Sequence, residues 1–169
     1  MPLFLWPIIV LVLIFLFTVL FGAPYVPSRN AELDKAFKKL YPLSKKDFLI
    51  DLGSGDGKVL RAAHKFGAKS LGLELNPILV AISRWRLRRL KDAKVLCRDF
   101  FLYDFPTETT VVYVFGDGRD MARIVRHIEK QAERIGHPIF LISHAFKAEG
   151  YKAEKCYRAY YLYKIKEKK

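Results

Sequence analysis

The chain has 169 residues and a formal net charge of +13, from 30 Lys and Arg against 17 Asp and Glu. Once a membrane segment is set aside, that length leaves room for one compact domain and excludes a multidomain assembly. The positive charge favours anionic partners such as lipid headgroups, nucleic acid or acidic proteins, although a solvated charged surface explains it equally well.

The N-terminal stretch from Leu3 to Phe21 is apolar apart from Thr18, and the first charged side chain is Arg29. Its length predicts a transmembrane helix, with the lipid bilayer as its partner. A cleaved signal peptide is the alternative, but no basic residue precedes the run and Ala23 lacks a small-x-small pattern. Basic residues soon after the run then predict a single-pass membrane protein with its catalytic domain in the cytoplasm.

We therefore expect three segments: an anchor over residues 1–23, a linker with a short helix over 24–46, and a folded domain over 47–169. Apolar runs that alternate with amphipathic stretches predict strands and helices in turn. The expected strands are 48–52, 70–75, 93–97, 110–115 and 138–143, and the expected helices are 30–41, 58–66, 77–90 and 119–135. With the Tyr-rich segment 156–165 as an antiparallel last strand, this order predicts an α/β fold with a mainly parallel, doubly wound sheet.

The two cysteines and the four histidines show no spacing typical of metal ligands, so we expect no metal site. In a reducing compartment, Cys97 and Cys156 are expected to be small buried hydrophobic residues rather than a disulfide.

A glycine-rich turn follows the first predicted strand, in the order Asp51-Leu-Gly-Ser-Gly-Asp-Gly57. Lys58 stands where a dinucleotide fingerprint needs glycine, and a phosphate-binding loop fails by spacing as well. An acidic residue, Glu74, ends the second strand at the distance typical of a ribose-binding carboxylate. Each feature also has a plain structural explanation: Asp51 could cap a turn, Glu74 could be a solvated charge, and the glycines could form an ordinary tight turn.

The pattern D-x-G-x-G-x-G resembles motif I of the class I S-adenosylmethionine-dependent methyltransferases. Over about residues 24–120, the segments PYVPS, DLGSGDGKV, GLELNP, SRWR and RDF also occur in an order similar to one family. They resemble the protein-lysine methyltransferases of the ATP synthase c-subunit and the adenine nucleotide translocase, together with their prokaryotic relatives. The resemblance implies a Rossmann-like fold, S-adenosylmethionine as cofactor, and a membrane-associated lysine methyltransferase.

The cofactor residues expected from this resemblance lie in the glycine loop and after the second and third strands. Asp99 matches the family's acidic position beside adenine, and Phe100 is expected to cover the ring, although core packing explains Phe100 as well. The full expected set is Asp51, Gly53, Ser54, Gly55, Gly57, Glu74, Leu75, Asn76, Asp99 and Phe100.

The acceptor side is expected after the fourth and fifth strands, at the sheet edge where ligands bind in open α/β sheets. We expect Asp117 to orient or deprotonate an acceptor amine. The expected substrate pocket comprises Tyr25, Pro27, Phe115 and His144, with a stiff linker as the alternative for the first two.

The predicted activity is N-methylation of lysine in a membrane or membrane-associated protein. The sequence VFGDG replaces the N/D-P-P-Y/F motif of many nucleic-acid amino-methyltransferases, which disfavours RNA or DNA as substrate. A nucleic-acid or small-molecule methyltransferase remains an alternative, as does a non-catalytic, membrane-anchored module that binds cofactor or lipid. A basic stripe of Arg84, Arg88 and Lys91 fits either anionic lipid or an ordinary exposed helix face.

Overall fold

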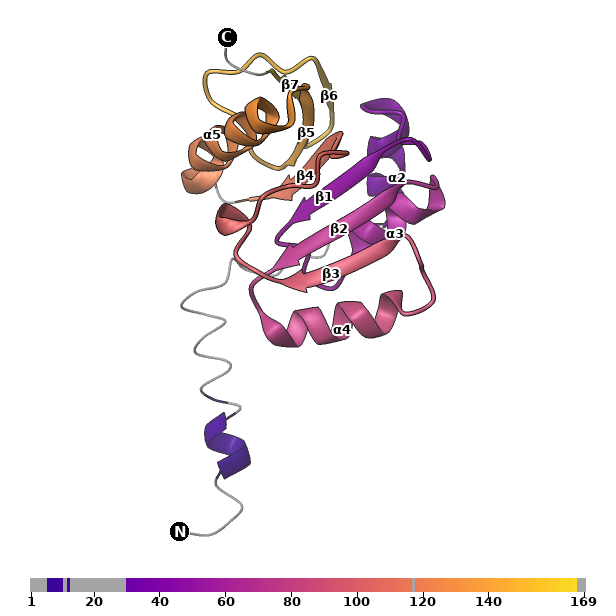
Figure 1. Cartoon of the computed structure of the whole chain (residues 1–169), viewed down its shortest axis with the longest axis vertical. Helices are drawn as coiled ribbons and strands as arrows, with labels where there is room; N and C mark the ends of the chain where they lie inside the picture. Colours follow the sequence, from indigo (N-terminus) through magenta and orange to yellow (C-terminus); the bar gives the residue numbers. More distant parts are fainter. Residues whose placement is uncertain (1–5, 11, 13–29, 117, 167–169) are drawn as a thin grey trace.

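The computed structural model describes residues 6–10, 12, 30–116 and 118–166 (Figure 1). A seven-stranded sheet forms its centre, in the order β3-β2-β1-β4-β5-β7-β6. The strands are β1 (Phe48–Leu52), β2 (Lys69–Glu74), β3 (Ala93–Cys97), β4 (Val111–Phe115), β5 (Ile139–His144), β6 (Lys155–Tyr157) and β7 (Tyr160–Ile165). The predicted fold is thus confirmed: β1 to β5 pair in parallel, and β7 runs antiparallel to β5.

The C-terminal segment forms a hairpin rather than the single expected strand. Residues of β6 and β7 pair antiparallel across a two-residue turn, with Tyr157 opposite Tyr160. Arg158 in that turn has φ 54°. A positive φ at a non-glycine residue is uncommon and leaves little signal in the sequence, which explains why the break within 156–165 was not expected.

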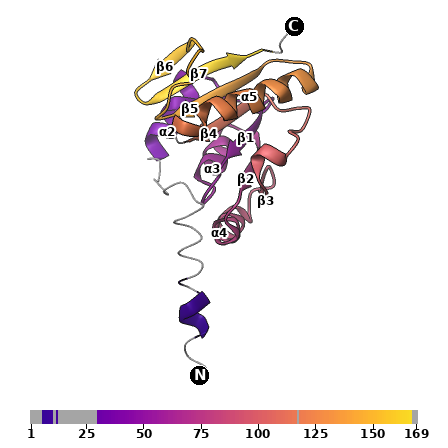
Figure 2. The ribbon, with the colours of Figure 1, turned by 90° about the vertical axis from the view of Figure 1, so that its left-hand side faces the viewer.

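Helices cover both faces of the sheet (Figure 2). Those around it are α2 (Asn30–Lys39), α3 (Lys58–Lys65), α4 (Pro77–Leu87) and α5 (Gly118–Ile135), and a short 3₁₀ turn, η1 (Phe100–Leu102), follows β3. One hydrophobic cluster joins α2, α3 and α4 to the sheet face that carries Leu49 and Tyr113. A second cluster packs α5 on the opposite face, against Ile50 and Val112. Successive strand residues point to opposite faces of the sheet, so each buried strand contributes side chains to both clusters.

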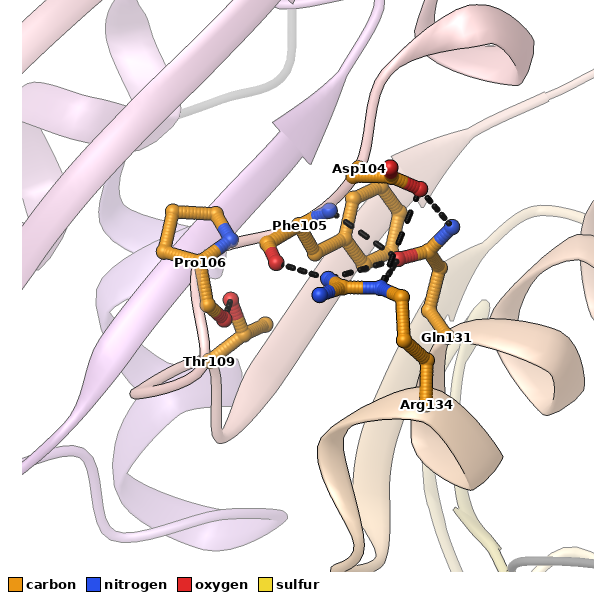
Figure 3. A network of polar contacts seen from close by, with 6 residues as sticks. All are labelled: Asp104, Phe105, Pro106, Thr109, Gln131 and Arg134. Carbon is orange, nitrogen blue, oxygen red and sulfur yellow. Dashed lines mark hydrogen bonds and ion pairs between the residues drawn. The ribbon is translucent and has the colours of Figure 1, made fainter.

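A polar network fixes the loop between η1 and β4 onto α5 (Figure 3). The Gln131 side chain accepts a hydrogen bond from the Phe105 backbone N–H at 3.0 Å and donates one to the Asp104 carboxylate at 3.2 Å. Arg134 donates to the Phe105 carbonyl oxygen and to the Gln131 amide oxygen. The network satisfies backbone groups that a loop would otherwise leave unpaired, and it fixes the chain that leaves the end of β3.

The structure corrects the predicted membrane topology. In the parts of the chain that it describes, no helix is both long enough and apolar enough to cross a bilayer. The expectation of a single-pass membrane protein is therefore overturned. Most of the predicted anchor, residues 1–5, 11 and 13–23, lies outside the described residues.

The prediction that the cysteines are buried is also wrong. Cys97 and Cys156 are both free and exposed. They lie on β3 and β6, the two edge strands of the sheet. An edge strand has a neighbour on one side only, so a small hydrophobic residue there need not be covered.

Candidate active site

The glycine-rich loop occupies the sharp turn between β1 and α3. Gly53, Gly55 and Gly57 all have positive φ, at 74°, 52° and 78°. L side chains rarely adopt this conformation, which explains glycine at these positions. Two backbone hydrogen bonds fix the loop to β2: the Gly53 and Ser54 N–H groups both donate to the Leu73 carbonyl oxygen, at 2.9 and 3.2 Å.

Glu74 connects this loop to the start of α4. One of its carboxylate oxygens accepts a hydrogen bond from the Gly55 N–H and the other accepts one from the Asn76 N–H, each at 2.8 Å. Asn76 in turn caps α4 through its side-chain oxygen, which accepts from the Ile78 N–H at 2.9 Å, and Pro77 begins the helix as predicted. Each Glu74 oxygen retains a second lone pair, so the carboxylate can still accept hydrogen bonds from a diol.

Asp51 is a buried carboxylate at the end of β1, with 2% of its surface exposed. Its Oδ2 atom has no hydrogen-bond partner among the described residues, and the Ser54 Oγ of the adjoining loop also has none. Burial raises the pKa of Asp51 well above its ordinary value, and the nearby Glu74 and Asp56 carboxylates raise it further. A cationic group on a ligand would stabilise the ionised form of Asp51, and hydrogen-bond donors on the ligand would pair with its free oxygen atom. The site therefore fits a cofactor that carries an ammonium and a sulfonium group.

We expect Asp51→Asn to stabilise the cofactor-free protein at neutral pH. The raised pKa means that the native state holds this proton more tightly than the unfolded state. The Asp51 carboxyl therefore lowers stability as pH rises from its ordinary pKa towards its raised one. The advantage of the variant should grow as pH rises above the ordinary Asp pKa and vanish in acid, below that pKa. Urea unfolding of both proteins across this pH range measures the difference; a constant difference at every pH would contradict the prediction.

Gly72 is a site residue that the sequence analysis missed. It lies in β2 directly opposite Asp51 of β1. A Cβ atom at this position would lie 2.4 Å from the Ser54 Oγ and 2.8 Å from a methyl group of Leu60. The glycine thus lets the loop pack against the strand. A glycine inside a strand often marks such a close approach, and that was the available signal.

The third expected part of the cofactor site follows β3. Asp99 caps η1, because its carboxylate accepts a hydrogen bond from the Phe101 N–H at 2.9 Å. The Phe100 and Phe101 rings lie 4.3 Å apart between centroids, and both pack on the cluster beneath α5. The core-packing explanation for Phe100 therefore describes part of its environment, while its partial exposure leaves it available to a ligand. Leu75, beyond Glu74, is exposed.

A second group of side chains lies at the ends of β4 and β5. The Tyr113 hydroxyl is 3.2 Å from Nδ1 of His144, and the His144 ring stacks on Tyr160 of β7 at 4.1 Å. Phe115 pairs with His144 in register, and their rings lie 4.9 Å apart. Burial lowers the pKa of His144 below its ordinary value, outweighing the Glu32 carboxylate, which raises it. His144 is consequently neutral at pH 7. No pattern along the chain joins Tyr113 or Tyr160 to this group.

The backbone beside His144 is strained. Ala145 has φ 72°, and its N–H donates to the Ala159 carbonyl oxygen of the β6–β7 turn at 2.7 Å. An L residue in this region costs about 1 kcal/mol or more, so surrounding contacts must hold it there. The hairpin thereby fixes the end of β5 and the orientation of His144.

The sheet order arranges these residues along one edge. Asp99, Glu74, Asp51, Phe115 and His144 follow or end β3, β2, β1, β4 and β5, which are neighbours in this order. The carboxylates thus occupy one half of the edge and the aromatic group the other, meeting at the topological switch point between β1 and β4. Of the remaining predicted residues, Asp117, Tyr25 and Pro27 lie outside the described residues. Within the described ranges, no group of three His, Cys, Asp or Glu side chains is arranged to hold a metal ion.

This arrangement of strands and glycine loop defines the class I methyltransferase fold. An RNA methyltransferase from Salinibacter ruber, solved with S-adenosyl-L-homocysteine, superposes with a TM-score of 0.75 over 85% of this chain and 96% of its own, at 24% identity. A geranyl diphosphate methyltransferase solved with S-adenosylmethionine gives a TM-score of 0.55 over 68% of this chain and 48% of its own, at 18% identity. These likenesses concern the fold.

Sequence comparison identifies the family. Residues 51–155 match the ANTKMT methyltransferase domain, so the chain belongs to that family. The human lysine N-methyltransferase of the ATP synthase c-subunit is 34% identical over 113 residues, which are 65% of this chain and 47% of that protein. The Caenorhabditis elegans protein of the same name is 37% identical over 99 residues, or 53% of this chain and 52% of its own.

The mouse adenine nucleotide translocase lysine N-methyltransferase is 39% identical over 67 residues, which are 37% of this chain and 28% of its own. The chain spans about half the length of the human and Caenorhabditis elegans relatives that it matches. The family resemblance read from the sequence motifs is thereby confirmed.

Proposed function

We propose that this chain is an S-adenosylmethionine-dependent methyltransferase that methylates lysine in a protein. The observation that carries the proposal is the buried Asp51 carboxylate beside the glycine loop and Glu74, whose Oδ2 atom has no hydrogen-bond partner among the described residues. Membership of a methyltransferase family and the names of the relatives support it. S-adenosylmethionine, when bound, supplies an electrophilic methyl group on a positively charged sulfur.

On this proposal, each half of the sheet edge has its own task. Asp51 neutralises positive charge of the cofactor, Glu74 accepts hydrogen bonds from the ribose hydroxyls, and Ser54 and the loop backbone bind its polar groups. Asp99 and Phe100 bind the adenine, and Leu75 and Asn76 flank it.

We assign the folded domain to residues 47–169, with α2 packed into its core through Leu33, Ala36 and Phe37.

The aromatic half of the edge is assigned to the acceptor. A lysine must lose a proton before its lone pair can attack the methyl carbon, and a partly buried, apolar site favours the neutral amine. His144 contributes because it is neutral at pH 7 and therefore does not repel the incoming ammonium. Its Nδ1 faces Tyr113, so Nε2 is the atom that we assign to hydrogen-bond the amine. Tyr25, Pro27 and Asp117 remain proposed contributors on this side.

Replacing His144 with alanine is expected to lower kcat by about 10-fold or more, because the amine loses a positioning hydrogen bond. The dissociation constant for S-adenosylmethionine should stay within about 2-fold, since no cofactor contact is removed. The wild-type rate should also decline on the acid side once His144 becomes protonated, at a pH below the ordinary His pKa.

His137→Ala is the matched control, since that ring contacts backbone oxygens of Pro138 and Thr107 away from the site. Loss of cofactor binding in His144→Ala, or an equal loss of activity in His137→Ala, would contradict the role assigned to His144.

The acceptor is tested with tritiated S-adenosylmethionine and purified ATP synthase c-subunit from the same organism. Transfer of label that disappears when the lysines have been acetylated would support a lysine acceptor. Transfer that survives acetylation would exclude it. Total RNA is offered as a parallel substrate, because the basic surface would also suit an RNA methyltransferase. Label in RNA and none in protein would contradict the proposed lysine acceptor and favour RNA as the substrate.

A further inference from the structure

Helix α4 exposes apolar side chains on its outward face. Ile78, Ile82 and Trp85 are 41%, 38% and 65% exposed, at spacings of four and three residues that place them on one side. The inward face is formed by Val80, Ser83 and Leu87, which are buried. A helix on the surface of a globular protein normally turns polar residues outward. This helix lies beside β3, at one end of the sheet (Figures 1 and 2), and none of the three outward apolar side chains belongs to either hydrophobic cluster of the described residues.

The same helix and the turn after it are strongly basic. No acidic residue occurs between Glu74 and Asp92. Five cations fall in that interval: Arg84, Arg86, Arg88, Arg89 and Lys91. Among the described residues, only Arg86 of these five forms an ion pair, with Asp56 of the glycine loop. The other charges are thus left for an anionic partner.

Part of this charge lines a groove of about 390 Å³ between α4 and β3. Its cations are Arg84, Arg88, Lys91 and Lys94, and Leu87 and Val95 contribute apolar walls. Arg84 is fixed there because its Nε donates to the Val95 carbonyl oxygen at 3.1 Å. The Arg88 guanidinium lies 4.7 Å from the centre of the Trp85 ring, so the groove and the apolar row are continuous.

We propose that this surface, the α4 face with its adjoining groove, binds the interface of an anionic lipid bilayer. A row of Ile and Trp beside Arg and Lys is the arrangement by which helices lie in the plane of a membrane interface. The groove cations would bind lipid phosphates, while Ile82 and Trp85 enter the boundary between headgroups and acyl chains. Nucleic acid would pair with the cations and leave Ile78 and Ile82 in water, which favours lipid. The proposed contact is peripheral and needs no helix that crosses the bilayer.

The test uses Trp85 as its own reporter in the full chain. The sequence has two tryptophans, so Trp6→Phe leaves Trp85 alone. Vesicles of phosphatidylcholine, with or without phosphatidylglycerol, are titrated in, and a matched set carries bromine on the acyl chains. Because the apolar N-terminal run can partition into lipid by itself, the emission of Trp85 is followed rather than sedimentation. We expect a blue shift and bromine quenching that depend on phosphatidylglycerol.

Removal of two groove charges in Arg88→Gln/Lys91→Gln should raise the phosphatidylglycerol content needed for half-maximal quenching several-fold. The control is Arg126→Gln/Lys130→Gln, which removes the same charge from exposed positions on α5. Circular dichroism checks that both variants fold. Unchanged Trp85 emission with anionic vesicles would overturn the proposal, as would equal effects of the two double variants. A Trp85 response to single-stranded RNA without a response to vesicles would overturn it as well.

Discussion

Replacing Glu74 with alanine is expected to weaken S-adenosylmethionine binding by about 10- to 100-fold. The carboxylate accepts hydrogen bonds from the Gly55 and Asn76 N–H groups, and it is the acceptor assigned to the ribose hydroxyls. The variant therefore loses ligand contacts and also leaves the loop and the start of α4 without their common partner. Titration calorimetry with S-adenosylmethionine measures the change in the dissociation constant.

Glu149→Ala is the charge-matched control, because Glu149 is exposed and is not part of the proposed cofactor site. Glu74→Gln gives a second comparison: its single amide oxygen can retain one of the two backbone bonds but not both, so its affinity should be intermediate. If Glu74→Ala folds with the wild-type melting temperature and binds with wild-type affinity, the assigned cofactor site is wrong. If the wild-type chain folds and does not bind, the proposed function itself fails.

Replacing Gly72 with alanine is expected to lower the free energy of unfolding by about 1–3 kcal/mol, the usual range for an overpacked core position. The added methyl group would lie 2.4 Å from the Ser54 Oγ and 2.6 Å from the Ser54 Cβ. The loop must move to accommodate it, so affinity for S-adenosylmethionine should fall as well. Urea unfolding and calorimetry measure the two effects.

The double variant Ser54→Gly/Gly72→Ala distinguishes this explanation from a general effect on the strand. Removal of the Ser54 side chain takes away the nearest obstacle, and the remaining contact, 2.8 Å from a Leu60 methyl group, can relax by rotation of that side chain. Part of the lost stability should return. A double variant that is no more stable than Gly72→Ala would show that the loop contact is not the cause.

The sequence predicted the parallel half of the fold well, because its signals there are local. The run FLIDL is buried on both faces as β1, and Asn76 and Pro77 begin α4 through chemistry confined to neighbouring residues. The positions of Asp51 and Glu74 at the same sheet edge also followed, since parallel strands that alternate with helices bring their carboxyl ends together.

Other features depend on contacts between segments that are distant in sequence. The Tyr113–His144–Tyr160 group joins β4, β5 and β7, and no spacing along the chain indicates that these rings stack. The exposure of the cysteines depends on which strands form the sheet edges, and strand order was not part of the prediction. The hairpin break at Arg158 depends on a single backbone angle.

The proposed acceptor side draws in part on residues outside the matched family domain. The family match covers residues 51–155, whereas Tyr160 lies after it and Glu32 of α2, whose charge acts on His144, lies before it. On the proposed assignment, the segment shared with relatives carries the cofactor machinery, and the flanking segments complete the surface that meets the acceptor. On this assignment, a change in α2 or in the terminal hairpin alters the surface beside His144 and leaves the proposed cofactor residues in place.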